Sequence, residues 1–187
     1  MSITALDPVS ALVVIDLQKG IVAGEKAHPT QQVVANAAKL AEAFRSYGLP
    51  VVLVNVKGGA PGRTERGINN SPRPDDWADL VTELRPQPSD IFITKHQWGA
   101  FYQTGLDEQL KKQNVTQIIL AGIATSMGVE STARAAHEHG YNVAFATDAM
   151  TDANIEAHDS SLNNIFPKIG EIGSTDEIIE LLNKSNN

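Results

Sequence analysis

The sequence of 187 residues contains no cysteine, and this absence excludes several kinds of chemistry. Without a thiol the chain forms no disulfide bond and offers no thiolate nucleophile for covalent catalysis. Zinc sites that depend on cysteine ligands are excluded for the same reason.

An excess of positive charge and a long apolar segment are missing as well. The chain carries 15 basic and 22 acidic residues, for a net charge of −7, which argues against nucleic acids and anionic membranes as partners. No segment is apolar over the length needed to span a bilayer, and the first ten residues lack the basic and apolar regions of a signal peptide. We therefore expect a cytoplasmic location.

Length and composition fit one folded unit. With 42% hydrophobic and 20% charged residues, the sequence is that of an ordinary soluble protein. A chain of this size buries about 70% of its unfolded surface. No internal repeat, low-complexity stretch or linker interrupts it, so residues 1–187 are expected to form a single domain.

Six short apolar runs alternate with segments of helical periodicity, a pattern that predicts a mainly parallel sheet with helices on both faces. The expected architecture is a three-layer α/β/α, Rossmann-like domain. A long loop at 57–74 lies between two of these elements, and such loops are usually functional or mobile. Strands are expected at 11–15, 51–56, 90–94, 117–123, 142–147 and 169–172, helices at 29–47, 75–84, 104–112, 126–140, 154–165 and 174–183, and a loop at 17–28.

The stretch 115–132 is the centre of this pattern. A buried strand at 117–123 is followed by a turn at 122–128 and a helix to Gly140, which stands where a C-cap glycine belongs. Such a turn points backbone N–H groups toward the carboxyl end of the strand, where open α/β sheets bind ligands. Many strand-turn-helix units have no site at this turn, so both interpretations stay open.

Two charged residues directly follow apolar runs. Asp16 ends the run ALVVI, and Lys95 ends the run DIFIT. Asp16 is either an acid or base in a pocket of low polarity or a carboxylate that binds nearby backbone N–H groups at a strand end. Lys95 is a candidate partner for it, although most lysines are free at the surface.

Several motifs resemble the isochorismatase-like hydrolases, also called the cysteine hydrolase superfamily, over nearly the whole chain. They are VVIDLQ, with Asp16 and Gln18; the set Lys95, Ala100, Phe101, Thr104 and Leu106; GIATSMGVESTARAA; and DAMTD at 148–152. This resemblance implies the strand order 3-2-1-4-5-6, which sets the first and fourth strands side by side. Asp16, Lys95 and Gly128 are then expected to meet at one edge of the sheet.

The resemblance also implies roles for residues of the turn. Most members have a nucleophilic cysteine where this chain has Gly128, and true isochorismatases carry a glycine there. Gly128 is thus expected to give a ligand room rather than a thiol, with Asp16 and Lys95 as the other catalytic residues. A cis peptide is implied between Ile123 and Ala124, and the N–H groups of Ala124 and Gly128 are implied to form an oxyanion hole. Ile123, Ala124 and Thr125 of this turn are expected to bind substrate, together with Gln18 of the first motif.

Three further side chains are candidates for substrate binding. Trp98 and Phe101 follow Lys95 and either form an aromatic wall of the site or pack in the core. Arg66, in the run Thr-Glu-Arg-Gly, resembles an arginine that helps true isochorismatases hold a substrate carboxylate. The alternative for Arg66 is a solvated loop side chain.

Metal and other cofactors are not expected. Related nicotinamidases bind a metal through an Asp-x-His pair after the second strand, but this region has no histidine. His137 and His139 are two residues apart on a helix, so they do not face one ion together. We interpret His158, at a position common in the family, as structural.

The leading hypothesis is hydrolysis of a small acidic metabolite without a covalent thiol intermediate. Asp16 is then the general acid that protonates the vinyl-ether carbon of an enol-pyruvyl substrate such as isochorismate, and Lys95 positions or tunes it. Because Lys95 lowers the pKa of Asp16, burial has to outweigh it. The alternatives are a non-catalytic binding protein and an amide hydrolase that uses Asp16-activated water. By analogy, a homo-oligomer, either a dimer or a tetramer, is expected.

Overall fold

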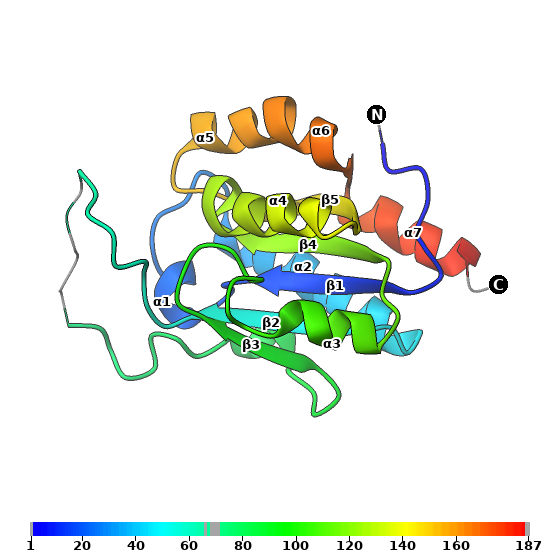
Figure 1. Ribbon diagram of the computed structural model, residues 1–187, viewed down its shortest axis with the longest axis horizontal. Helices are drawn as coiled ribbons and strands as arrows, with labels where there is room; N and C mark the ends of the chain where they lie inside the picture. Colours follow the sequence, from blue (N-terminus) through cyan, green and yellow to red (C-terminus); the bar gives the residue numbers. More distant parts are fainter. Residues whose placement is uncertain (1, 66, 68–71, 186–187) are drawn as a thin grey trace.

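The computed structural model describes residues 2–65, 67 and 72–185, whose strands form one six-stranded sheet. The order is β3-β2-β1-β4-β5-β6, and neighbouring strands are parallel (Figure 1). This confirms the predicted order, with β1 and β4 side by side. The strands are β1 Ser10–Ile15, β2 Val51–Val56, β3 Ile91–Lys95, β4 Gln117–Ile123, β5 Asn142–Thr151 and β6 Glu171–Gly173.

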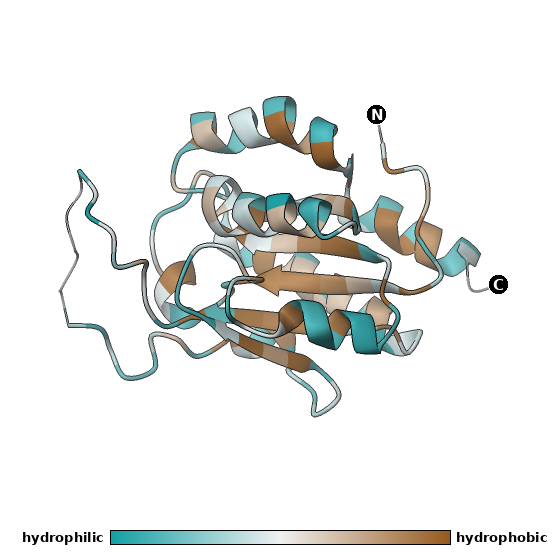
Figure 2. Ribbon diagram, in the orientation of Figure 1, coloured by the Kyte–Doolittle hydropathy of each residue, from teal (hydrophilic) through white to brown (hydrophobic). Residues whose placement is uncertain are grey.

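Side chains of β1 alternate between two hydrophobic clusters, one on each face of the sheet. Leu12 and Val14 belong to one cluster, and Val13 and Ile15 belong to the other. Because both faces are covered, the central strands are continuous apolar runs, mostly brown in Figure 2. The helices are α2 (Thr30–Ser46) and α7 (Thr175–Ser185) on the first face, and α3 (Leu106–Lys112), α4 (Glu130–Glu138) and α6 (Phe166–Ile169) on the second. The predicted three-layer α/β/α architecture is confirmed.

The segment that follows β1 differs from the prediction of a loop. It contains one helical turn, α1 (Lys19–Val22). The N–H groups of Ile21 and Val22 both donate to the Gln18 carbonyl, at 3.0 and 2.9 Å. This turn lies beyond the carboxyl end of β1 (Figure 1).

The prediction of a helix at 75–84 is wrong. The segment forms turns and then a single turn of 3-10 helix, η1 (Thr82–Leu84). Its backbone is engaged by α1 instead: the carbonyls of Trp77 and Asp79 each accept from an N–H group of α1, at 2.9 Å. Leu80 also forms an isolated antiparallel bridge with Gln18. These tertiary hydrogen bonds replace the ones a helix would make.

The segments that follow β4 and β5 position the residues at the carboxyl end of the sheet. A π-helical turn, η2 (Thr125–Val129), joins β4 to α4. β5 extends to Thr151 rather than ending at residue 147, and it is followed by α5 (Ile155–Ser160) and a second π turn, η3 (Ser161–Ile165). Because the strands are parallel, the carboxyl ends of β1, β3, β4 and β5 lie along the same edge of the sheet.

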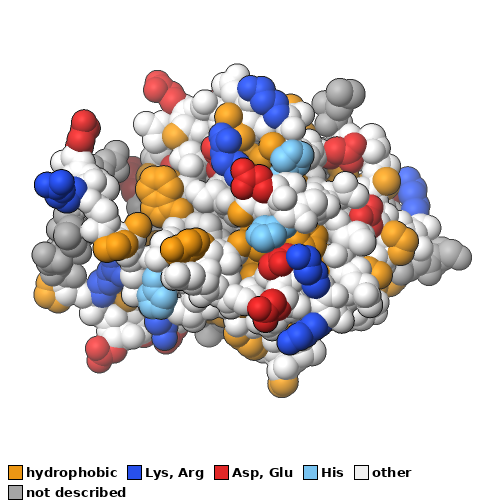
Figure 3. All heavy atoms as spheres, viewed as in Figure 1, with side chains coloured by type: hydrophobic (Ala, Val, Ile, Leu, Met, Phe, Trp, Pro, Cys, Tyr) orange, Lys and Arg blue, Asp and Glu red, His pale blue; other side chains and the backbone are white. Residues whose placement is uncertain are grey.

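The surface at this edge is partly apolar. On the face shown in Figure 3, acidic and basic side chains are interspersed, and hydrophobic side chains gather toward the end at which β1 points. Trp98, in the loop after β3, and Met127, in η2, are exposed large hydrophobic residues there. None of the helices in the described ranges is long and apolar enough to cross a membrane.

Candidate active site

A cavity of about 360 Å³ opens at the carboxyl edge of the sheet. Asp16 and Lys95 lie in it, as the strand order predicts. Of the residues predicted to form the site, those that line this cavity are Asp16, Lys95, Trp98, Ile123, Ala124 and Gly128. The structure thus brings the ends of β1, β3 and β4 together in one hollow.

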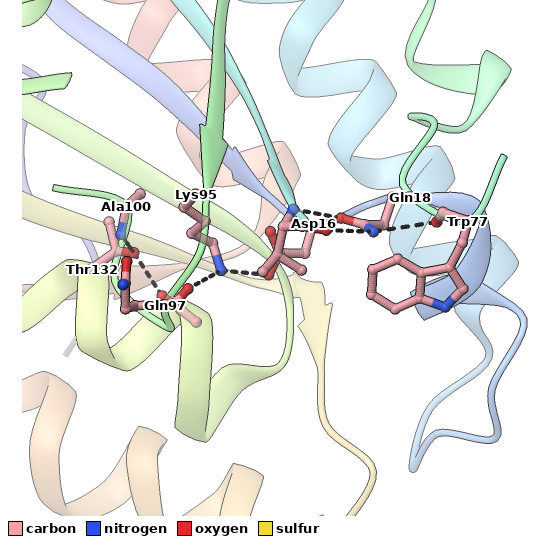
Figure 4. A network of polar contacts seen from close by, with 9 residues as sticks. Asp16, Gln18, Trp77, Lys95, Gln97, Ala100 and Thr132 are labelled. Atoms are coloured by element: carbon pink, nitrogen blue, oxygen red, sulfur yellow. Dashed lines mark hydrogen bonds and ion pairs between the residues drawn. The ribbon is translucent and has the colours of Figure 1, made fainter. Parts of the chain in front are cut away.

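Asp16 and Lys95 form a buried ion pair. Nζ of Lys95 donates to Oδ2 of Asp16 at 2.7 Å, and the two residues are only 2% and 5% exposed, respectively. Lys95 also donates to the carbonyl of Gln97 at 3.2 Å, which fixes the ammonium group (Figure 4). The other carboxylate oxygen, Oδ1, is buried and has no hydrogen-bond partner in the described part of the chain.

The backbone of Asp16 is also unusual. Its φ angle is 51°, in the left-handed region that residues other than glycine seldom adopt. Such a conformation costs on the order of 1–3 kcal/mol and persists where surrounding structure enforces it, often at functional sites. Here the N–H group of Asp16 donates to the Val54 carbonyl at 3.0 Å, and the Asp16 carbonyl accepts from the N–H group of Gln18 at 2.8 Å.

Burial decides the protonation of Asp16. Removing the carboxylate from water raises the pKa of Asp16 to about 6, although the Lys95 ammonium group acts in the opposite direction. The condition set by the sequence, that burial must outweigh Lys95, is therefore met. The carboxyl group therefore titrates near pH 6.

Gly128 lies between Ile15 and the Asp16 carboxylate. A Cβ atom at this position would lie 2.9 Å from Cγ2 of Ile15 and 3.4 Å from Oδ2 of Asp16. A side chain here would meet Ile15, whereas Gly128 itself lines the cavity, so the space that it leaves for a ligand stays a prediction. What the glycine does leave open is the approach to the Asp16 carboxylate.

The turn around Gly128 is held from both sides. The Ile123–Ala124 peptide is cis, as the resemblance implies. The N–H and hydroxyl groups of Ser126 both donate to Oδ2 of Asp152, each at 2.8 Å. The hydroxyl of Thr132 donates to the Gly128 carbonyl at 2.6 Å and accepts from the N–H of Ala100 at 3.0 Å, which ties the turn to the loop after Lys95 (Figure 4).

Comparison with known proteins agrees with this geometry. The sequence model of the Isochorismatase domain matches residues 10–177. The chain belongs to the isochorismatase family. Members of this superfamily are hydrolases, and the chain is therefore an isochorismatase-family hydrolase.

Individual relatives match over most of their length. The isochorismatase family protein YwoC of Bacillus subtilis (strain 168) is 45% identical over 178 residues, covering 91% of this chain and 93% of YwoC. A solved isochorismatase family protein from Burkholderia thailandensis has a TM-score of 0.93 and 40% identity, covering 97% of this chain and all of that one (100%). The ureidoacrylate amidohydrolase RutB of Pseudomonas syringae pv. syringae (strain B728a) is 30% identical over 199 residues, covering 90% and 81% of the two chains.

Three residues predicted to bind substrate lie away from the cavity. Gln18 is fully buried, and its amide group bonds the backbone of Val56 and the Trp77 carbonyl. Phe101 packs in the core and stacks on His139, with ring centroids 5.1 Å apart, so the alternative of core packing holds. Thr125 is buried and bonds the ring of His158 at 2.8 Å. Arg66 lies outside the described residues.

Other residues of the cavity were not predicted from the sequence. Lys26, Arg73, Trp77 and Asp152 line it, together with Met127. They stand in loops, in a helical turn or just after a strand, where no periodicity marks them. Two of them lay in family motifs: Asp152 ends DAMTD, which follows the fifth apolar run, and Met127 is part of GIATSMGVESTARAA.

His158 has the structural surroundings expected for it. Its ring is buried beneath the turn, 4.7 Å from the ring of His28, and burial lowers its pKa, with a further lowering by His28. Within the described ranges, no group of three or more His, Asp or Glu side chains is placed to hold a metal ion.

Proposed function

We propose that this hydrolase cleaves a small anionic metabolite without a covalent thiol intermediate and that Asp16 is its general acid. The observation that carries the proposal is the state of the Asp16 carboxyl group. It is buried at the cavity, its pKa lies near 6, and Oδ1 has no partner among the described residues. A general acid is most effective when its pKa is near the working pH.

The proposed reaction is hydrolysis of a vinyl ether such as isochorismate. Protonated Asp16 gives its proton to the terminal vinyl carbon, where the electron pair of the double bond forms the new C–H bond. The ether-bearing carbon becomes an oxocarbenium ion, water adds to it, and the water's extra proton returns to Asp16. The resulting hemiketal breaks its bond to the ring oxygen, which takes the hydroxyl proton, and pyruvate leaves.

Lys95 has two roles in this proposal. Its hydrogen bond to Oδ2 fixes the orientation of the carboxyl group in the site. When the proton has moved, the ammonium group stabilises the carboxylate that remains, an interaction strengthened by the low polarity of the site. The N–H groups of Ala124 and Gly128 are proposed to orient substrate or water, and Trp98 and Ile123 to contact the substrate.

A second candidate is hydrolysis of an amide by water that Asp16 activates as a base. The 30% identical relative RutB, an amidohydrolase, favours this candidate. The two candidates require opposite forms of Asp16. Vinyl-ether hydrolysis needs the protonated acid and slows as the pH rises through about 6, whereas base catalysis needs the carboxylate and accelerates over the same range.

The first test is pyruvate release from isochorismate by the purified protein and by Asp16→Asn. Asp176→Asn, an equivalent change of an exposed aspartate in α7, is the matched control. We expect turnover in the wild type and the control, and its loss in Asp16→Asn. Turnover that persists in Asp16→Asn contradicts the assignment of the acid. No turnover in the wild type removes isochorismate as the substrate and leaves other hydrolyses or a binding role.

The homo-oligomer implied by the family resemblance stays a prediction. Tyr102 and Ile155 are exposed large hydrophobic side chains, which are consistent with an interface between copies of the chain. Sedimentation velocity of the wild type, with Tyr102→Glu as the variant, tests it. A monomer in both samples contradicts the prediction.

A further inference from the structure

The cavity contains more cationic than anionic side chains, although the chain as a whole is acidic. Asp16 and Lys95 balance each other, and Asp152 accepts two hydrogen bonds from Ser126. Lys26 and Arg73 also line the cavity, and neither forms an ion pair with a carboxylate among the described residues. A hollow of this kind attracts anions.

Arg73 is held by an aromatic ring. Its guanidinium carbon lies 4.0 Å from the centroid of Trp77, a stacked cation–π arrangement. Stacking occupies the face of the guanidinium group and leaves its N–H edge available for a bidentate bond to a carboxylate. A side chain ordered in advance in this way loses less entropy when it binds a ligand.

Trp77 is in turn fixed by the segment that follows β1. Its carbonyl accepts from the N–H of Gly20 at 2.9 Å and from the Gln18 amide at 3.2 Å (Figure 4). Its ring lies against Gly20 so closely that a Cβ atom there would be 1.9 Å from Cδ1 of the indole. Gln18 thus acts on the site indirectly, through the position of Trp77.

Lys26 contributes the second unpaired cation. Its ammonium group donates to the carbonyls of Ile21 and Gly24 at 2.8 and 3.0 Å. An ammonium group carries three N–H donors, so one remains for a ligand. Burial lowers the pKa of Lys26, with Asp152 acting in the opposite direction, and an anionic ligand would compensate this loss of hydration.

We propose that Arg73, stacked on Trp77, and Lys26 form a subsite that binds the carboxylate of a small organic acid. The inference rests on the proposed function, whose substrate class it specifies. At about 360 Å³ the cavity lies toward the small end of ligand pockets, which span about 300–1,000 Å³. Trp98, in the same cavity, gives an apolar surface for the rest of the molecule.

The test is equilibrium binding of benzoate by calorimetry, with the neutral isostere benzamide as the matched ligand. We expect saturable binding of benzoate at millimolar concentration and much weaker binding of benzamide. Arg73→Gln and Lys26→Gln are each expected to raise the Kd for benzoate by about tenfold or more, since each removes a charged hydrogen bond. Arg63→Gln, in the same loop but outside the cavity lining, is the control and is expected to bind as the wild type does.

Benzoate binding that is absent, matched by benzamide, or unchanged in both glutamine variants overturns the subsite. The same titration on Asp16→Asn separates this inference from the proposed reaction. If Asp16→Asn binds benzoate but the wild type releases no pyruvate from isochorismate, the subsite stands and the reaction is wrong. If pyruvate release depends on Asp16 while Arg73→Gln and Lys26→Gln bind benzoate normally, the reaction stands and the subsite is wrong.

Discussion

The Lys95 ammonium group donates to the Asp16 carboxylate at 2.7 Å, yet the pKa of Asp16 is raised to about 6. A surface carboxylate beside a lysine shows the opposite direction. The difference arises because both side chains are almost fully buried, so the loss of hydration outweighs the attraction. This balance allows one residue to hold a proton in a cavity that already contains a cation.

The raised pKa predicts how stability depends on pH. The native state binds the Asp16 proton more tightly than the unfolded chain, in which the pKa is near its ordinary value of 3.8. The stability that this proton contributes is fully present below about pH 3.8 and is lost as the pH rises through about 6, by on the order of 3 kcal/mol in total. Urea unfolding across this range should show the stability of the wild type falling relative to that of Asp16→Asn as the pH rises. A difference that does not change with pH contradicts the raised pKa.

Replacing Gly128 by alanine is expected to reduce turnover more than stability. The added methyl group would lie 3.4 Å from Oδ2 of Asp16 and would displace a methyl group of Ile15. Alanine is favourable by about 0.5–1 kcal/mol in a helical backbone, which offsets part of the crowding. We expect a fall in kcat/KM of about tenfold with a change in unfolding free energy below about 1 kcal/mol. Gly99→Ala, whose Cβ would meet Ser131 at 3.6 Å, is the control; equal effects of both variants would refute the specific role of Gly128.

Thr132→Val tests the connection between the turn and the Lys95 loop. The substitution keeps the shape of the side chain but removes the hydroxyl that bonds the Gly128 carbonyl and the Ala100 N–H. Leaving buried backbone groups unsatisfied costs about 1–3 kcal/mol each. Denaturant unfolding should therefore show a loss of about 2 kcal/mol or more, together with a lower kcat. Thr132→Ser, which retains the hydroxyl, should recover most of both; failure to recover contradicts the role assigned to the hydrogen bonds.

Gly20→Ala is expected to weaken carboxylate binding without unfolding the protein. The new methyl group would overlap the Trp77 indole, with Cβ 1.9 Å from Cδ1, so the ring and the Arg73 group stacked on it must move. We expect the Kd for benzoate to rise by about tenfold. Gly62→Ala, where a Cβ meets nothing within 4 Å, should leave the Kd unchanged. Normal benzoate binding by Gly20→Ala indicates that Trp77 does not position the subsite.

The sequence predicts the sheet well because its central strands are buried on both faces. The runs that became β1 and β4 are almost wholly apolar, so their limits are clear. Their order in the sheet required the family resemblance, since connection handedness leaves several orders possible. The failures are α1 and the segment 75–84, whose backbones bond each other, and local patterns do not report such contacts.

The residues of the site also fall into those that the sequence predicts and those that it does not. Asp16 and Lys95 stand directly after strands, and that position marks them in the sequence. Gln18, in a family motif, was expected in the cavity but lies behind it, because a motif does not reveal which way a side chain points. Lys26, Arg73 and Trp77 meet only in three dimensions. No spacing along the chain indicates that an arginine will stack on a tryptophan beside a glycine of α1.

The most direct test of Asp16 as the general acid is the pH dependence of kcat/KM for pyruvate release from isochorismate, between about pH 5 and pH 8. Protonated Asp16 as the active form predicts a decline with a midpoint near pH 6, and no activity in Asp16→Asn. A rate that rises through pH 6 would contradict the account, because it would mean that the carboxylate acts as a base.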